Sequence, residues 1–212
     1  MTKLQLALDN DLNNAFRILK EVHSFIDIIE IGTPMIIREG MNAVRQVRLK
    51  YPHLTLLADL KIMDAGKEEA DIAFEAGADI VTVLGVTNDT TVEGAVQSAN
   101  NWGKQIMIDM MCVTNPVESG QKFIHMGCDI LCVHTAYDQQ SSKDSPYQEL
   151  KLLRQNLPLS KLAIAGGINN AKLDSALKYQ PDIVIVGNAI TGKNDYVEHA
   201  KQIKEKLTNY AG

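Results

Sequence analysis

Asp27-Ile28-Ile29 and Asp79-Ile80-Val81 are two copies of one pattern, an aspartate followed by two branched apolar residues. The pattern returns, slightly altered, as Asp129-Ile130-Leu131 and Asp182-Ile183-Val184. The four copies stand about fifty residues apart along the chain. Because each aspartate opens a short apolar run, each copy predicts the start of a β-strand. A period of this length indicates that one structural unit is repeated four times.

A second series of apolar runs lies between these copies and ends, rather than begins, in an aspartate. Its first three members end at Asp9, Asp59 and Asp109, again about fifty residues apart. The fourth member, residues 162–165, continues into Gly166-Gly167 instead. The two series interleave, and together they predict eight strands.

Helical patterns separate the predicted strands. The strands are continuous apolar runs, which is typical of parallel strands with helices on both sides. Repeated β-α units without a dividing linker predict an α/β protein, a single (β/α)8 TIM barrel domain over residues 1–212. An open doubly wound sheet is the alternative. Apolar residues at helical spacing predict helices over residues 12–23, 35–50, 65–76, 90–101, 116–126, 147–156, 171–178 and 196–207.

The composition excludes several classes of protein. Of the 212 residues, 45% are hydrophobic and 22% are charged, and the formal net charge is -5. An acidic chain has no basic face for nucleic acid, so we expect no nucleic-acid partner. No apolar run approaches the roughly 20 residues of a membrane span, so we expect no membrane association. Cys128 and Cys132 border a predicted strand and are expected to be reduced core thiols, which favours a cytoplasmic location.

Charged residues gather where the predicted strands end, and in a barrel of this kind the chemistry lies at the C-terminal strand ends. Asp59 and Lys61 are two residues apart, so on an extended strand their side chains point the same way. Taken singly, each such residue is readily explained as a cap or a salt bridge. Their convergence on one rim predicts a site. The expected rim residues are Asp9, Glu30, Asp59, Lys61, Asp109 and His134.

Two of these rim residues predict a metal site. Glu30 and Asp59 lie on neighbouring strands and offer hard oxygen ligands without a nearby histidine or cysteine cluster. Such a set suits Mg2+ better than Zn2+. The alternative is that Lys61 alone bridges the two carboxylates.

His134 is the candidate general base or acid, because a histidine titrates near neutrality and this one ends a predicted strand. The other histidines are His23, His53, His125 and His199, which we expect in helices or connections, facing solvent. Gly166-Gly167 and Gly187-Asn188 follow the last two predicted strands. Loops at these positions commonly bind phosphate through backbone N–H groups, which predicts a phosphate site.

The motif from Asp59 to Asp64, Asp-x-Lys-x-x-Asp, and the segment Ala165-Gly166-Gly167-Ile168 resemble the orotidine monophosphate decarboxylase superfamily of barrels. Within it, Glu30-Ile31-Gly32-Thr33-Pro34 and the segment from His134 to Gln140 are most similar to the 3-hexulose-6-phosphate synthases. The resemblance covers essentially the whole chain. The related 3-keto-L-gulonate-6-phosphate decarboxylases typically carry an arginine where this chain has Tyr137, and Gly-Arg where it has Gly187-Asn188.

The resemblance implies a Mg2+-dependent aldol reaction that joins formaldehyde to D-ribulose 5-phosphate, as in formaldehyde fixation by the ribulose monophosphate pathway. It implies that Glu30 and Asp59 bind Mg2+, that His134 removes a C1 proton and that Lys61 stabilises the resulting enediolate. It further implies a homodimer in which Asp64 completes the partner's site. Thr33, Asp9 and Asp109 are expected to contact the substrate. The alternatives are the decarboxylase and a non-catalytic phosphosugar-binding barrel.

Overall fold

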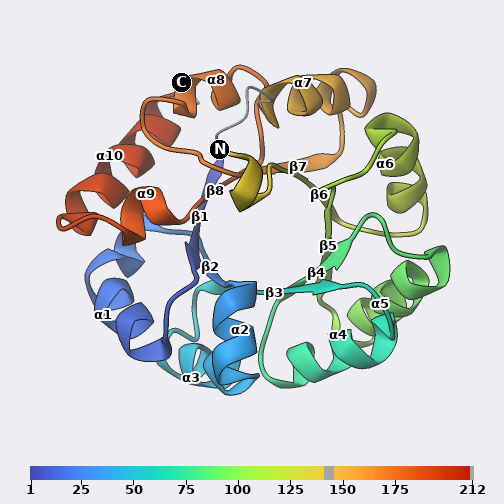
Figure 1. Cartoon of the computed structure of the whole chain (residues 1–212), viewed down its shortest axis with the longest axis horizontal. Coiled ribbons are helices and arrows are strands. Elements are labelled where there is room, and N and C mark those ends of the chain that lie inside the picture. Colours follow the sequence, from blue (N-terminus) through green and yellow to red (C-terminus); the bar gives the residue numbers. More distant parts are fainter. Residues whose placement is uncertain (141–145, 211–212) are drawn as a thin grey trace.

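The computed structural model describes residues 1–140 and 146–210, so residues 141–145 and 211–212 of the expected domain lie outside the described residues. The strands form one closed parallel barrel in which each strand pairs with the next and β8 pairs with β1 (Figure 1). The open doubly wound sheet is thereby excluded. The strands are β1 (Lys3–Leu8), β2 (Ile28–Ile31), β3 (Thr55–Ile62), β4 (Ile80–Leu84), β5 (Gln105–Asp109), β6 (Ile130–His134), β7 (Lys161–Ala165) and β8 (Ile183–Val186).

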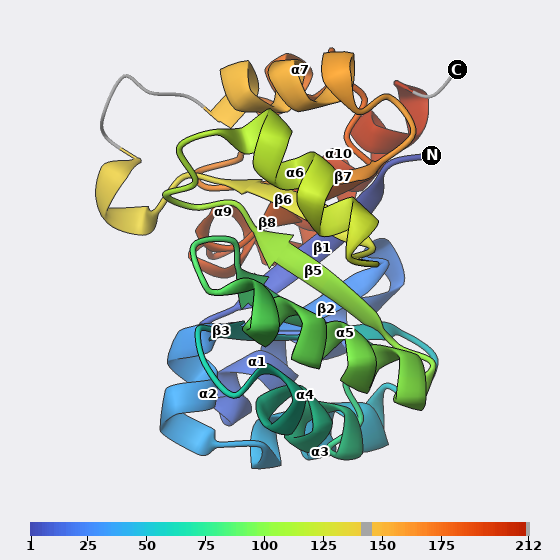
Figure 2. The ribbon, with the colours of Figure 1, turned by 90° about the vertical axis from the view of Figure 1, so that its right-hand side faces the viewer.

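Helices surround the barrel, and Figure 2 shows that the N-terminus lies at the side opposite to the one toward which the β5 arrow points. None of the helices in the described part of the chain is both long and apolar enough to cross a membrane. The helices are α1 (Leu12–Val22), α2 (Thr33–Glu39), α3 (Asn42–Lys50), α4 (Gly66–Glu75), α5 (Asp89–Trp102), α6 (Pro116–His125), α7 (Pro146–Asn156), α8 (Leu173–Leu177), α9 (Asn188–Thr191) and α10 (Tyr196–Asn209), with short 3-10 turns η1 (His23–Phe25) and η2 (Tyr137–Gln139).

The helix predicted over residues 35–50 is wrong as a single element. Gly40 takes the left-handed φ of +61° and donates its N–H to the carbonyl oxygen of Ile36, which ends α2. A new helix, α3, begins two residues later. The short helix α9 was not predicted either, because four residues are too few to show helical periodicity.

The repeated aspartates have a structural explanation. Asp79 donates its N–H to the carbonyl oxygen of Leu56 at 2.7 Å, and its Oδ2 accepts the N–H of Leu56 at 2.9 Å. Each repeat aspartate therefore ties its own strand to the start of the preceding strand, at the N-terminal end of the barrel. The same two hydrogen bonds join Asp27 to Leu4, Asp129 to Ile106, and Asp182 to Leu162.

The barrel interior has an apolar floor, to which every strand contributes a buried side chain. Polar side chains stand two residues further along five of the strands, toward the C-terminal ends. The pairs are Ile28 and Glu30, Leu57 and Asp59, Ile80 and Thr82, Met107 and Asp109, and Cys132 and His134. Cys128 and Cys132 are buried and free, as expected. The two-residue period of the strands thus places the polar set directly above the floor, at the mouth.

Candidate active site

Asp59 and Lys61 meet at the mouth through an irregular strand. The pairing of β3 with β4 shifts register between Ala58 and Ile62, and Lys61 has a left-handed φ of +49°. The expectation of a regular extended strand is therefore wrong at Lys61. The two side chains nevertheless come together, because Lys61 Nζ lies 2.8 Å from Asp59 Oδ2 and 3.0 Å from Oδ1.

Lys61 also reaches across the barrel. Its Nζ lies 3.1 Å from Oδ2 of Asp109, so one ammonium bridges carboxylates from β3 and β5. Burial lowers the pKa of Lys61, but the negative charges of Asp59 and Asp109 outweigh burial and hold that pKa well above its ordinary value. Lys61 is therefore held in its charged form between Asp59 and Asp109.

Asp109 connects Lys61 to His134. His134 Nδ1 lies 2.9 Å from Asp109 Oδ2, and Asp109 Oδ1 accepts the N–H of Met111 at 3.0 Å. Burial raises the pKa of Asp109, but the hydrogen bond and charge of His134, the charge of Lys61 and the Met111 N–H lower it to about 2. An ionised carboxylate only accepts hydrogen bonds, so Nδ1 carries a proton, and in the neutral ring the lone pair is on Nε2. This arrangement prepares His134 to take up a proton at Nε2.

Glu30 is buried beside this ion-pair network and is held from below. Gln5, a fully buried residue of β1, donates from Nε2 to Oε2 of Glu30 at 2.5 Å. Burial and the nearby charge of Asp59 raise the pKa of Glu30 to about 8. Gln5 Oε1 has no hydrogen-bond partner among the described residues. Sequence reasoning missed Gln5, although a single amide inside the apolar run 4–8 was a usable signal.

Two carboxylates of the mouth, those of Glu30 and Asp59, could together bind a divalent cation. Within residues 1–140 and 146–210, no group of three or more His, Cys, Asp or Glu side chains is arranged to hold a metal. Glu30 and Asp59 are buried oxygen donors, and the pKa of Glu30 is raised first by its burial and then by the nearby charge of Asp59. Mg2+ commonly binds through one or two carboxylates and takes its other oxygens from substrate and water. The donor set fits that mode of binding.

Thr33 and Asp9 lie on the same side of the mouth. Thr33 Oγ1 lies 2.8 Å from Asp59 Oδ2 and 2.7 Å from the Asp59 carbonyl oxygen, so this hydroxyl supports Asp59. Asp9 follows β1 and is exposed. Its carboxylate sits against Gly32, where an added Cβ would lie 2.1 Å from Asp9 Oδ1. The glycine after Glu30 therefore leaves room for Asp9 at the rim.

Asp64 stands apart from the other predicted residues. It is exposed beyond β3, and its Oδ1 accepts the N–H of Ala65 at 2.8 Å. In the described part of the chain, no ion pair links Asp64 to Lys61 or to the other charged residues of the mouth. Its position is compatible with a role outside the site of its own chain.

The glycines predicted to bind phosphate follow β7 and β8. Gly166 and Gly167 have φ values of +101° and +66°, which other residues rarely adopt. Gly166 also lies so close to Thr135 that an added Cβ would be 2.4 Å from the Thr135 carbonyl oxygen. Gly187 precedes α9, and the side chain of Asn188 turns toward Gly192 at the end of that helix.

The remaining histidines lie in helices or connections, as expected. His23, His53 and His125 are exposed, whereas His199 is half-buried. Expectation and structure differ only in the degree of exposure of His199.

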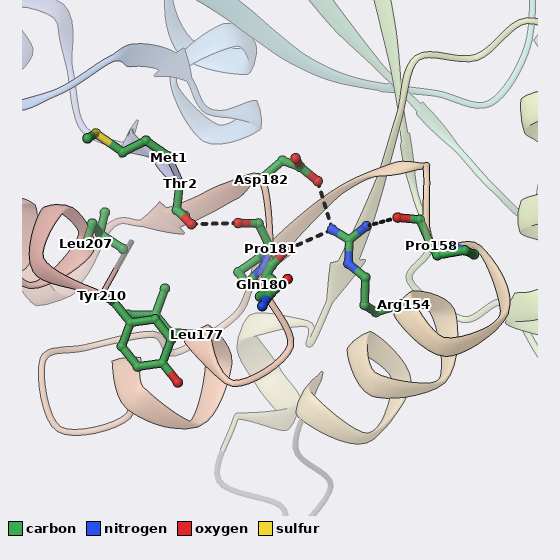
Figure 3. A pocket seen from close by; sticks show the side chains of 10 residues that line it. All are labelled: Met1, Thr2, Arg154, Pro158, Leu177, Gln180, Pro181, Asp182, Leu207 and Tyr210. Atoms are coloured by element: carbon green, nitrogen blue, oxygen red, sulfur yellow. Dashed lines mark hydrogen bonds and ion pairs between the residues drawn. The ribbon is translucent and has the colours of Figure 1, made fainter. Parts of the chain in front are cut away.

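A cavity of about 530 Å³ opens between the N-terminus and the segment before β8, away from the residues of the mouth (Figure 3). Arg154 lines it, but the guanidinium is occupied by the carbonyl oxygens of Pro158, Ser160 and Gln180 and by Asp182. Arg154 thus fastens the loops at this end of the barrel, and the cavity offers no comparable chemistry.

Comparison with known proteins gives concordant matches. The family model described as orotidine 5'-phosphate decarboxylase / HUMPS family matches residues 2–203. The 3-hexulose-6-phosphate synthase of Bacillus subtilis (strain 168) is 44% identical over 206 residues, which cover 97% of this chain and 98% of that protein. The crystal structure of 3-hexulose-6-phosphate synthase from Salmonella typhimurium has a TM-score of 0.96 and 41% identity, covering 99% of this chain and 100% of that one. A 3-keto-L-gulonate-6-phosphate decarboxylase from Vibrio cholerae, with a TM-score of 0.85 and 24% identity over 99% of this chain and 98% of that one, shares the fold.

Proposed function

The chain belongs to the orotidine 5'-phosphate decarboxylase / HUMPS family, and we propose that within it the chain is a 3-hexulose-6-phosphate synthase. In this reaction formaldehyde and D-ribulose 5-phosphate combine to give D-arabino-hex-3-ulose 6-phosphate. The observation that carries the proposal is the connected network from Asp59 through Lys61 and Asp109 to His134, beside the buried Glu30. It offers an oriented base and a charged ammonium next to a pair of carboxylates suited to a metal.

Tyr137 favours the synthase over the decarboxylase. The decarboxylases typically carry an arginine at this position, three residues after the histidine. In this chain a neutral side chain that is 79% exposed stands there. The relatives named 3-hexulose-6-phosphate synthase are also much closer in sequence, at 44% and 41% identity against 24%.

Glu30 and Asp59 would hold Mg2+. When bound, the ion would polarise the C2 carbonyl of ribulose 5-phosphate and thereby acidify the C1 protons. Both oxygens of Asp59 already accept hydrogen bonds from Lys61 and from the hydroxyl of Thr33 or Thr82. For Asp59 to bind a cation, Lys61 must therefore move away from one of these oxygens. That movement would turn its ammonium toward the substrate.

His134 Nε2 would remove a proton from C1, because Asp109 fixes the other ring nitrogen as a donor. The electron pair left at C1 spreads onto the C2 oxygen, and the ammonium of Lys61 stabilises the enediolate charge. C1 then attacks the carbon of formaldehyde, and the electron pair of its C=O bond moves onto oxygen. The proton held by His134 returns to that oxygen, directly or through Lys61 or water. Atoms and protons balance without any other reactant.

The phosphate would bind at Gly166, Gly167, Gly187 and Asn188, through backbone N–H groups. These residues follow β7 and β8, whereas Asp59 and Lys61 belong to β3, so the substrate would span the mouth. Binding energy gained at the phosphate positions C1 against His134. Asp9 would contact the sugar from the rim beside Gly32.

A homodimer is part of the proposal. Asp64 is exposed, and so are the apolar side chains of Met63, Val86 and Ile37 on the loops and helix that follow β2, β3 and β4. A second copy that covers this face would receive Asp64 in its own mouth. A cytoplasmic location is also proposed, and the free thiols agree with it.

The function is tested by giving the purified protein two substrates. We expect Mg2+-dependent loss of formaldehyde with ribulose 5-phosphate, and slow or no release of CO2 from 3-keto-L-gulonate 6-phosphate. Faster CO2 release than aldol formation would assign the chain to the decarboxylase instead. Binding of ribulose 5-phosphate without turnover of either substrate would identify a phosphosugar-binding barrel.

A further inference from the structure

Thr82 is a buried residue at the middle of β4, only 4% exposed, and its hydroxyl makes two contacts within the mouth. Its Oγ1 accepts the backbone N–H of Lys61 at 2.9 Å. The same Oγ1 donates to Asp59 Oδ1 at 2.7 Å. One hydroxyl therefore contacts both residues of the Asp-x-Lys pair: it accepts a hydrogen bond from Lys61 and donates one to Asp59.

The contact with Lys61 falls where β3 departs from regular geometry. Left-handed backbone at a residue other than glycine costs on the order of 1 kcal/mol and persists only where the surroundings hold it. The register shift between Ala58 and Ile62 removes the ordinary ladder partner of the Lys61 N–H. The Thr82 hydroxyl replaces that partner, so it sustains the unusual conformation of Lys61.

The contact with Asp59 directs the carboxylate. Thr82 binds Oδ1 from β4, while the Thr33 hydroxyl lies 2.8 Å from Oδ2 on the side of β2. The carboxylate is thereby held between two hydroxyl groups, one from β4 and one from the start of α2. A valine at position 82 would fill nearly the same volume but would provide neither hydrogen bond.

We propose that Thr82 is a positioning residue that holds Lys61 in its left-handed conformation and Asp59 in its orientation, and so sets where the Lys61 ammonium stands. This inference rests on the proposed function for its kinetic consequence. Its structural consequence, the backbone conformation of Lys61, does not depend on the substrate.

The test compares Thr82→Val, Thr82→Ser and a control, Ser98→Ala. Ser98 is a fully buried residue of α5 whose hydroxyl donates to Asp71 of α4, so the control also removes a buried hydroxyl from a carboxylate. Each variant is assayed for kcat and KM with ribulose 5-phosphate, for exchange of the C1 proton in D2O, and for unfolding by urea. The backbone carbon chemical shifts of Lys61 are measured by NMR in the same samples.

We expect Thr82→Val to lower kcat and C1 exchange by roughly 10- to 100-fold, because small displacements of catalytic groups have effects of this size. KM should change by less than about threefold, since the proposed phosphate site lies on the far strands. Thr82→Ser should restore kcat to within about threefold, and Ser98→Ala should lose stability without losing kcat. In Thr82→Val alone, the backbone chemical shifts of Lys61 should change away from the values typical of a left-handed conformation.

Two results separate failure of this inference from failure of the proposed function. Wild-type protein that neither exchanges C1 protons nor forms the aldol product contradicts the function, and the Lys61 shifts then decide the role of Thr82. Wild-type activity, together with a Thr82→Val variant that behaves like Ser98→Ala and keeps the Lys61 shifts, overturns the inference.

Discussion

His134 Nδ1 lies 2.9 Å from Asp109 Oδ2, and this contact fixes which ring nitrogen can act as a base. Asp109 accepts hydrogen bonds from three donors, namely His134, Lys61 and the N–H of Met111. Its carboxylate satisfies all of them because it has two acceptor oxygens and no proton. The pair is therefore sensitive to any change that gives Asp109 a donor of its own.

Asp109→Asn should lower kcat by roughly 10²- to 10⁴-fold, the range seen when a catalytic histidine loses its carboxylate partner or the base itself is impaired. The amide keeps one acceptor oxygen for three donors and adds an NH₂ group that favours the wrong tautomer of His134. The decisive measurement is kcat against pH, with C1 proton exchange as a second readout. A variant with wild-type kcat would show that Asp109 does not orient the base.

Asp79, at the other end of the barrel, should matter for stability and not for catalysis. It accepts hydrogen bonds from Leu56, Arg48 and Lys104. Burial raises the pKa of Asp79, but these partners outweigh it and lower the pKa below its ordinary value. Asp79→Ala should reduce the free energy of unfolding by about 2–3 kcal/mol, since hydrogen bonds to a charged group are lost and their donors are left unpaired.

Unfolding in urea measures this loss, and kcat at 25 °C should stay within about twofold of wild type. Asp129→Ala is the matched control, because Asp129 occupies the same place in the repeat but, among the described residues, accepts only from Ile106 and Gln105. It should cost less. Equal losses in the two variants would mean that the contacts of Asp79 with Arg48 and Lys104 add nothing to the free energy of unfolding. Because the lowered pKa of Asp79 stabilises the fold only while it is ionised, the difference should shrink as the pH falls below about 4.

The fold was predictable because its signals are periodic. The pair of hydrogen bonds between Asp79 and Leu56 recurs at every second strand, so the sequence has an aspartate at the equivalent position of all four repeats. Parity along the strands was enough to place Glu30 and His134 in the mouth, since strand side chains alternate regardless of their neighbours. The helix over residues 35–50 failed at Gly40, where one backbone angle ends an otherwise uniform pattern.

The parts of the site that could not be predicted are those that depend on tertiary contacts. The left-handed φ of Lys61 leaves no trace in its residue type, because it is sustained by Thr82 from another strand. Gln5 and Thr82 lie inside apolar runs, and the composition of these runs predicts only buried strands. It does not indicate that Gln5 binds Glu30 or that Thr82 binds Asp59. The metal role of Glu30 and the cross-subunit role of Asp64 depend on an ion and on a second chain. Both roles therefore remain predictions.

Glu30 should destabilise the metal-free protein at high pH. Its pKa in the folded chain is raised, so the protonated form favours the folded state, and that contribution is lost as pH rises from the ordinary value of a glutamate through about 8. Wild type without Mg2+ should therefore lose stability over this range, by on the order of 5 kcal/mol. Glu30→Gln should lose much less, because the amide does not ionise.

Mg2+ provides the second half of this test. The ion should raise the Tm of wild type at pH 8 and should leave the Tm of Glu30→Gln unchanged, because the variant lacks one of the two carboxylates. Glu30→Gln should also have lost turnover, and EDTA should abolish the turnover of wild type. If EDTA leaves wild-type turnover intact, or if Mg2+ stabilises both proteins equally, Glu30 is not a metal ligand.

Asp64 should act in the mouth of the partner subunit, and mixed dimers test this directly. Asp64→Ala and His134→Ala should each be inactive as pure homodimers. In a heterodimer of the two, one mouth combines the intact His134 of one chain with the intact Asp64 of the other, and the second mouth lacks both. Random pairing of equal amounts should then restore about a quarter of wild-type activity, since half of the dimers carry one intact mouth each. Subunit exchange by co-refolding, followed by the aldol assay, measures the recovery.

A mixture that stays as inactive as its two components would place Asp64 in the mouth of its own chain or outside catalysis. A monomer on size-exclusion chromatography would remove the shared site altogether.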